Sequence, residues 1–158
     1  MKYIAPSILS ADFGHLANDI HMINESDADW LHIDVMDGVF VPNISFGFPL
    51  MKTFKQHSTK PLDVHLMIVH PEKYVERFCD AGAWSVGFHV EAVEDPLPIL
   101  ELIKAKGVRT CLTINPDIPA ERLVPYLDKV DMVLIMSVFA GFGGQKFIPE
   151  SLDKIRFI

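Results

Sequence analysis

The run Val133-Leu134-Ile135-Met136 is apolar without interruption. Because successive side chains of a strand point to opposite faces, a strand of this composition is apolar on both faces. That pattern is typical of parallel strands covered by helices, and not of antiparallel strands with one face in water. The run therefore predicts a parallel sheet.

Similar short runs, rich in residues that favour strands, recur along the chain and are separated by stretches with helical periodicity. This alternation predicts a series of βα units. The predicted strands are Tyr3–Leu9, Trp30–Val35, Leu62–Met67, Ser85–Val90, Val108–Ile114 and Met132–Val138. The predicted helices are Asp12–Asn24, Phe48–Gln56, Glu72–Ala81, Pro96–Lys106, Ala120–Leu127 and Pro149–Ile158.

The rhythm of strand and helix predicts an α/β fold of the parallel (β/α)₈ barrel type, with about six βα units present. No linker or charge block divides the sequence, so residues 1–158 are interpreted as a single, incomplete barrel domain. A closed barrel at this spacing needs roughly fifty more residues. Unclosed sheet edges invite pairing with another chain, which predicts a homo-oligomer.

Composition limits the classes of partner. The 158 residues include 14 basic and 21 acidic residues, for a formal net charge of −7, and no Lys/Arg cluster occurs. A nucleic-acid partner is therefore not expected. The N-terminal residues resemble neither a signal peptide nor a membrane span, so a cytoplasmic protein without membrane contact is predicted. Cys79 and Cys111 lack metal-type spacing and are expected to be reduced core residues.

Polar residues interrupt the predicted strands near their carboxyl ends, which is where parallel barrels place their active sites. His32 and Asp34 alternate on one strand, and His65 lies on its neighbour. Two imidazoles and a carboxylate suit a divalent ion such as zinc, iron, manganese or cobalt. The alternative is that the histidines are core residues with satisfied hydrogen bonds and that Asp34 caps a loop.

Two further features lie at the same predicted edge. The segment Gly141-Phe142-Gly143-Gly144-Gln145 follows the last strand and precedes a helix, a setting in which backbone N–H groups can hold a phosphate, although tight turns also need glycine. Met36, Met67 and Met136 come at strand ends. They either fill gaps in the core or line a pocket of low polarity.

Several segments together resemble the ribulose-phosphate 3-epimerase family, in order along the whole chain. The resemblance is most specific in the segment from His32 to Asn43, which reads HIDVMDGVFVPN. It is supported by Pro6-Ser7-Ile8-Leu9, Asp63-Val64-His65-Leu66-Met67, Phe88-His89-Val90-Glu91-Ala92 and Gly141-Phe142-Gly143-Gly144-Gln145-Lys146-Phe147.

The resemblance implies an isomerase that interconverts ribulose 5-phosphate and xylulose 5-phosphate in pentose phosphate metabolism. It implies a zinc-type site of His32, Asp34 and His65, in which Asp34 is also an acid/base catalyst. Substrate contacts are implied for the following residues: Ser7, His65, Met36, Met67, Met136, Gly141, Phe142, Gly143, Gly144 and Gln145. Removing the C3 proton beside a ketone gives an enediolate, which a metal stabilises.

The sequence departs from the family pattern at two places. The family's second catalytic Asp, its fourth metal ligand, lies in a Val-Asp-Gly-Gly segment on strand seven, and this sequence ends before it. Phe139-Ala140 replaces an acidic residue or Asn followed by Pro. The alternatives are an inactive truncated family member, an epimerase of a ketohexose 6-phosphate such as allulose 6-phosphate, or an aldolase or synthase that shares only the barrel.

Overall fold

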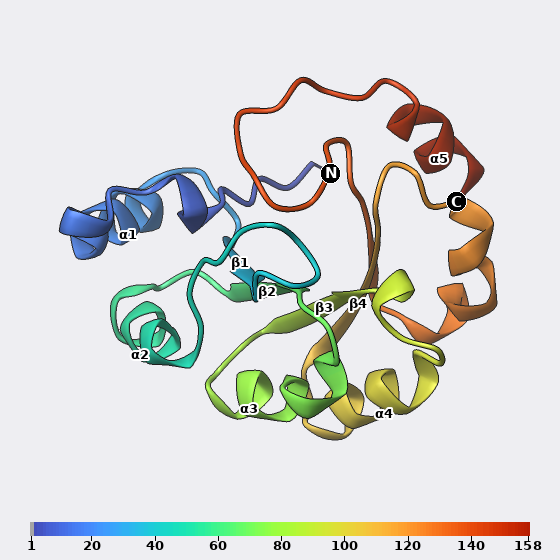
Figure 1. The fold of residues 1–158 in the computed structure, drawn as a ribbon. Coiled ribbons are helices and arrows are strands. Elements are labelled where there is room, and N and C mark those ends of the chain that lie inside the picture. Colours follow the sequence, from blue (N-terminus) through green and yellow to red (C-terminus); the bar gives the residue numbers. More distant parts are fainter. Residues whose placement is uncertain (1) are drawn as a thin grey trace.

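The computed structural model describes residues 2–158, which form one parallel sheet with helices between its strands (Figure 1). The five strands pair in the order in which they occur along the chain. They are β1 (Leu31–Met36), β2 (Leu62–Met67), β3 (Ser85–His89), β4 (Arg109–Ile114) and β5 (Met132–Ile135). The predicted α/β class with a parallel sheet is confirmed, and the sheet is open within these residues.

The helices follow the strands in an arc, with α2, α3 and α4 side by side along one face of the sheet (Figure 1). The α-helices are α1 (Leu16–Glu25), α2 (Phe48–His57), α3 (Val75–Asp80), α4 (Leu97–Ala105) and α5 (Ser151–Phe157). Short 3₁₀ segments are η1 (Ile8–Ser10), η2 (Phe13–His15), η3 (Pro71–Lys73), η4 (Val90–Ala92) and η5 (Ala120–Lys129). Among the described residues, no helix is long and apolar enough to cross a membrane.

The prediction of a first strand at Tyr3–Leu9 is wrong. The backbone there is extended beside β1, and the carbonyls of Ile4 and Pro6 accept hydrogen bonds from the N–H groups of Asp29 and His32. A regular ladder does not form, because Pro6 has no N–H to donate and the chain turns into η1 at Ile8. The described residues therefore contain five strands, and the number of βα units is five where about six were predicted.

The helix predicted at Ala120–Leu127 is also of a different kind. The segment is the 3₁₀ helix η5, with Pro125 inside it. Proline removes a backbone donor and disfavours α geometry in the residue before it, so a regular α-helix cannot run through this position. The other predicted helices occur, although 3₁₀ turns form the starts of two of them, at Phe13–His15 and Pro71–Lys73.

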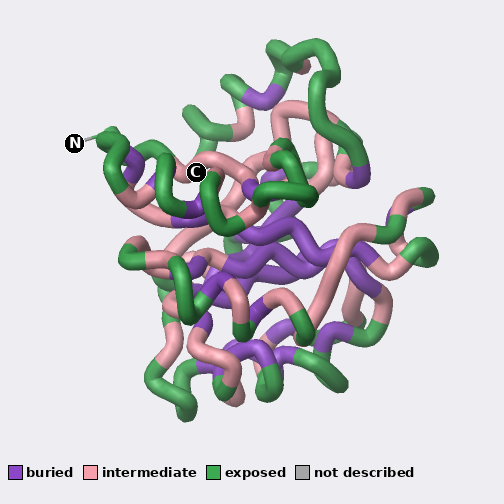
Figure 2. The backbone as a smooth tube through the Cα atoms, turned by 90° about the vertical axis from the view of Figure 1, so that its left-hand side faces the viewer, coloured by how far each residue is buried: buried purple, intermediate pink, exposed green. Residues whose placement is uncertain are grey.

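The core lies between the sheet and the helices. Alternate strand residues such as Ile33, Val64 and Phe88 pack against helix residues such as Phe54 and Phe78. Figure 2 shows the buried residues gathered in the strands, with exposed residues on the outer loops and helices. The opposite, inward face of the strands carries buried polar residues such as Asp34, His65 and His89, so the alternation of side chains separates a hydrophobic layer from a more polar one.

Both cysteines, Cys79 and Cys111, are free and buried, as the sequence predicted. Burial raises the pKa of the Cys79 thiol to about 11. A thiol with such a pKa stays protonated near neutral pH and is a poor nucleophile. The two cysteines therefore belong to the core.

Candidate metal centre

His32, Asp34 and His65 converge on the inward face of the sheet. Asp34 lies directly across from His65 in the pairing of β1 with β2, and His32 lies two residues before Asp34 on the same strand. One ligand atom from each residue lies within 4.8 Å of the others. The sequence predicted this grouping from strand alternation, and the parallel register of β1 and β2 produces it.

The position of the proton on the His32 ring follows from a hydrogen bond with Asp63. Its Nδ1 lies 2.8 Å from a carboxylate oxygen of Asp63, the residue beside it on β2. An ionised carboxylate only accepts hydrogen bonds, so the neutral His32 ring carries its proton on Nδ1. The lone pair of Nε2 then points toward Asp34 Oδ1, which is 3.3 Å away.

Two lone pairs that face each other require a positive charge between them. His65 Nδ1 also lies close to Asp34 Oδ1, at 3.1 Å. Imidazole nitrogen and carboxylate oxygen are a donor set for zinc and related divalent ions. The residues present therefore fit a divalent metal, with one ligand atom each from His32, Asp34 and His65.

Without a metal, a proton supplies the positive charge. Burial lowers the pKa of His32, but its hydrogen bonds to Asp34 and Asp63 outweigh burial and raise the pKa from 6.5 to about 10. Burial lowers the pKa of His65 to about 4. Burial opposes ionisation of Asp34, yet the two histidines hold its pKa well below 3.8. Asp34 is thus an ionised carboxylate.

A cavity of about 180 Å³ lies next to Asp34. It joins the end of the sheet to the segment between β5 and α5, which arches over toward the N-terminal residues in Figure 1. Most of the substrate-binding residues implied by the resemblance line it together with Asp34: Ser7, Met36, Met67, Met136, Gly141, Phe142 and Gly143. The Ser7 hydroxyl donates a hydrogen bond to Asp34 Oδ2.

Three of the implied residues lie outside this lining. His65 lies in the interior and contributes to a second cavity of about 140 Å³. Gly144 is exposed in the loop, and Gln145 turns back to donate to the carbonyls of Phe139 and Phe142, so its amide holds the loop's shape. Phe139, one of the two departures from the family pattern, is half exposed and lines the cavity beside Asp34.

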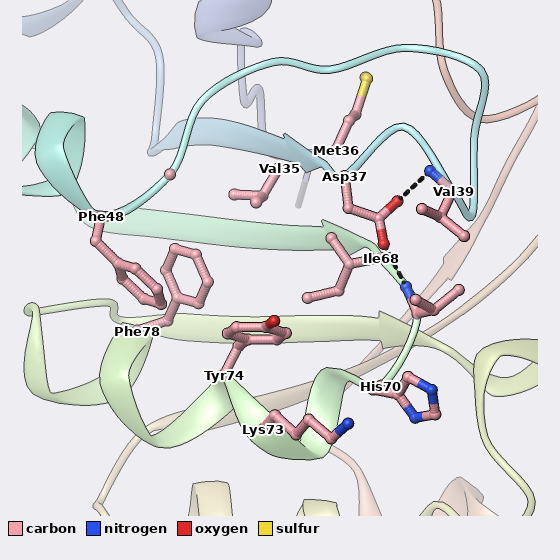
Figure 3. Close-up of a pocket in the computed structure, with 12 residues that line it drawn as sticks. Val35, Met36, Asp37, Val39, Phe48, Ile68, His70, Lys73, Tyr74 and Phe78 are labelled. Carbon is pink, nitrogen blue, oxygen red and sulfur yellow. Dashed lines mark hydrogen bonds between the residues drawn. The ribbon is translucent and has the colours of Figure 1, made fainter.

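A third cavity, of about 350 Å³, lies on the helix side of the sheet and contains none of the metal-group residues. Figure 3 shows Phe48 of α2 and Phe78 of α3 at one end of it and Asp37 at the other. The Asp37 carboxylate accepts hydrogen bonds from the N–H groups of Val39 and Val69, which belong to the loops after β1 and β2. Asp37 thus ties together two loops at the end of the sheet that carries the metal group.

Sequence reasoning assigned no role to His89, Glu91 and Asn115, which extend the polar network from His65. His89 is fully buried, and its Nε2 lies 2.9 Å from His65 Nε2. Its Nδ1 lies 2.8 Å from Glu91, and Glu91 accepts from Asn115. The signal present in the sequence was the position of His89 and Glu91, two residues apart at the end of a predicted strand.

Comparisons with known proteins fit this arrangement. A model of the ribulose-phosphate 3 epimerase family matches residues 3–158. The chain belongs to this family. The family resemblance found in the sequence is confirmed, and the protein is of the isomerase class.

Its relatives include ribulose-phosphate 3-epimerases from several organisms. The Synechocystis protein is 50% identical over 97% of this chain and 67% of its own length. The Mycobacterium tuberculosis protein is 44% identical over 98% of this chain and 67% of its own length. A rice relative named the cytoplasmic isoform is 43% identical over 97% of this chain and 69% of its own length.

Among solved structures, a mutant tryptophan synthase alpha-subunit from Pyrococcus furiosus superposes with a TM-score of 0.70. The match covers 99% of this chain and 74% of that chain at 17% identity. At this identity the similarity shows the fold alone. It agrees with an epimerase-family chain built on the (β/α) barrel architecture.

Proposed function

We propose that the chain epimerises C3 of a ketopentose phosphate, interconverting ribulose 5-phosphate and xylulose 5-phosphate, at a site that uses zinc. The observation that carries the proposal is the convergence of three lone-pair donors, from His32, Asp34 and His65, beside a cavity lined by methionines and a glycine-rich loop. The names of the relatives support the substrate.

Asp34 is the proposed acid/base residue, because it belongs to both the metal group and the cavity lining. Its Oδ1 faces the two histidines, and Ser7 holds its Oδ2. Removal of the C3 proton by the Asp34 carboxylate leaves the electron pair delocalised onto the neighbouring carbonyl oxygen as an enediolate. A divalent ion in the site supplies positive charge that stabilises this negative charge.

The remaining residues position the substrate. Met36, Met67 and Met136 keep water away from the reacting carbon, and the backbone of Gly141–Gln145 is proposed to contact the phosphate. The proposed setting is the cytoplasm, in a homo-oligomer that acts on a small sugar phosphate. A relative named as a cytoplasmic isoform supports the location.

The proton-abstraction step can be tested separately from the complete epimerisation. The zinc-loaded chain is incubated with ribulose 5-phosphate in D₂O, and NMR follows both deuterium uptake at C3 and the formation of xylulose 5-phosphate. Asp34→Asn is expected to reduce deuterium uptake by about 10²- to 10⁴-fold. The control is Asp131→Asn, which alters a carboxylate that caps Thr110 at the opposite end of the sheet. Undiminished uptake by Asp34→Asn would refute the role of Asp34.

A further inference from the structure

The hydrogen bonds beyond His65 have a direction that can be deduced from a backbone group. The N–H of Ala140 donates to Asn115 Oδ1 at 3.0 Å, and a backbone N–H can only donate. This contact fixes the orientation of the Asn115 amide, whose NH₂ group must then point the other way. Asn115 Nδ2 lies 2.9 Å from Glu91 Oε1, so Glu91 is the acceptor of that bond.

Glu91 acts as an acceptor toward His89 as well. Its Oε1 also receives the backbone N–H of Asn115 at 3.1 Å, and it lies 2.8 Å from His89 Nδ1. Burial opposes ionisation of Glu91, but its hydrogen bond and charge interaction with His89, together with the backbone donors, outweigh burial and lower its pKa below 4.5. A carboxylate has no proton to give, so His89 carries its proton on Nδ1.

One more hydrogen bond, between His89 and His65, connects Glu91 to the metal group. With its single proton on Nδ1, the His89 ring has a bare Nε2, and the 2.9 Å contact with His65 Nε2 is then a hydrogen bond that His65 donates. His65 therefore has its proton on Nε2 and a bare Nδ1. That Nδ1 is the atom that faces Asp34.

The packing around the two imidazoles keeps this arrangement in place. Gly87 is the β3 residue opposite His65 in the sheet, so no side chain stands between His65 and His89. The two rings are stacked with centroids 5.0 Å apart, and the Phe40 ring lies 4.8 Å from the His89 ring. With His89 fully buried, water cannot replace either ring nitrogen's partner.

We propose that His89 and Glu91 are positioning residues that fix the tautomer and orientation of His65, leaving its Nδ1 as the ligand atom for the divalent ion. The inference rests on the proposed function, because it concerns the metal group assigned there. Within the metal group, His89 forms a hydrogen bond with His65, and Glu91 reaches His65 through its own hydrogen bond with His89. Partners of this kind around metal-binding histidines typically change metal affinity by about 10- to 100-fold when they are removed.

The experiment measures zinc affinity of the full chain by competition with a chromogenic chelator. His89→Leu removes the acceptor for His65 and is expected to weaken zinc binding by about 10- to 100-fold. His89→Gln can place an amide oxygen near the position of the lost Nε2 and is expected to recover much of the affinity. Glu91→Leu is expected to weaken binding, whereas Glu91→Gln keeps an acceptor oxygen and is expected to weaken it less.

Thr113→Val is the matched control. Thr113 is the direct neighbour of His89 across β3 and β4, is equally buried, and its hydroxyl has no hydrogen-bond partner among the described residues. The change removes a buried oxygen at the same depth without touching the chain of bonds. Zinc affinity in Thr113→Val is expected to equal that of the unmodified protein.

A second measurement distinguishes positioning from general loss of structure. In the zinc-loaded protein, ¹⁵N NMR of the imidazoles is expected to show the His65 proton on Nε2, and this signal is expected to be lost in His89→Leu and retained in Thr113→Val. If the unmodified protein binds no zinc, the proposed metal site itself is wrong. If it binds zinc and folded His89→Leu and Glu91→Leu bind equally tightly with the same His65 signal, only this inference is overturned.

Discussion

At the scale of single residues, Asp63 decides which nitrogen of His32 is free. Its carboxylate accepts from His32 Nδ1 at 2.8 Å and leaves Nε2 for the metal group. We expect Asp63→Ala to lower zinc affinity by about 10- to 100-fold, because the ring can then rotate or carry its proton on Nε2. Isothermal titration of zinc into the chain checks this. Unchanged affinity in a folded Asp63→Ala variant would contradict the tautomer assignment.

Asp37 gives a pH-dependent prediction about stability. Burial opposes its ionisation, but N–H donors of Val39, Val69 and Phe40 outweigh burial and lower its pKa below 3.8. A lowered pKa in the folded state means that the carboxylate stabilises the fold above the unfolded-state pKa, and that this stabilisation is lost as pH falls through the folded-state pKa.

The variant to compare is Asp37→Asn. The carboxylate uses Oδ1 for Val39 and Phe40 and Oδ2 for Val69, as part of Figure 3 shows, and an amide has an oxygen for only one of these positions. We expect Asn to lower the free energy of unfolding by about 1 kcal/mol or more at pH 7. Urea unfolding at pH 7 and at pH 3 measures the difference, which should shrink at pH 3. A difference independent of pH would contradict this role.

At the scale of elements, Lys154 fastens α5 to the rest of the chain. Its ammonium group donates to three backbone carbonyls in the loop after β4, those of Asn115, Pro116 and Ile118. We expect Lys154→Met to destabilise the fold by about 1 to 3 kcal/mol, because the carbonyls lose a charged donor. Hydrogen exchange should then rise mainly in α5.

The control for that experiment is Lys129→Met. Lys129 forms an exposed ion pair with its neighbour Asp128, and exposed pairs contribute little to stability. Its free energy of unfolding should stay within about 0.5 kcal/mol of the unmodified protein. Equal losses in the two variants would mean that Lys154 contributes only surface charge.

Most strands and helices could be predicted from the sequence, and two segments could not. Hydrophobic periodicity located the five paired strands to within a few residues, because each needs an apolar face against the helices. It failed at Tyr3–Leu9, where the composition favours a strand but Pro6 offers no donor. It failed again at η5, where the apolar pattern of a helix continues through Pro125. Local backbone chemistry decided both segments.

The candidate site also contains residues that the sequence could predict and one contact that it could not. His32, Asp34 and His65 were predictable because strand alternation places them on one face of two adjacent strands. The link from His65 to His89 was not predictable from alternation alone. It depends on the stagger of β3 against β2, which puts Gly87 opposite His65 and lets two imidazoles meet. Such a register is set by packing of the whole sheet.

At the scale of the whole molecule, the sheet formed by residues 2–158 is open at β5, and this edge predicts self-association of a chain of these residues. Strand β5 is the last strand of the sheet, and all of its residues are only half-buried. An uncovered apolar edge pairs readily with another chain. We expect sedimentation velocity to show oligomers that increase with protein concentration, and Leu134→Glu, an inward-pointing charge on that strand, to reduce them. A monodisperse monomer at every concentration would contradict this expectation.

A hydrogen bond between residues far apart in the sequence holds Gly141, which lines the cavity beside Asp34. The Asn43 side chain donates to the carbonyl of Gly141, a residue 98 positions later in the chain, and a Cβ placed on Gly141, whose φ is +122°, would lie 3.4 Å from Val41 Cβ. The metal group, by contrast, comes from two neighbouring strands that are joined by a single helix. Because short loops close before long ones, the histidine–aspartate group can assemble early in folding, while the cavity exists only after the last strand has docked. We therefore expect the proposed ion site to be complete earlier in folding than the cavity that is proposed to hold the sugar phosphate.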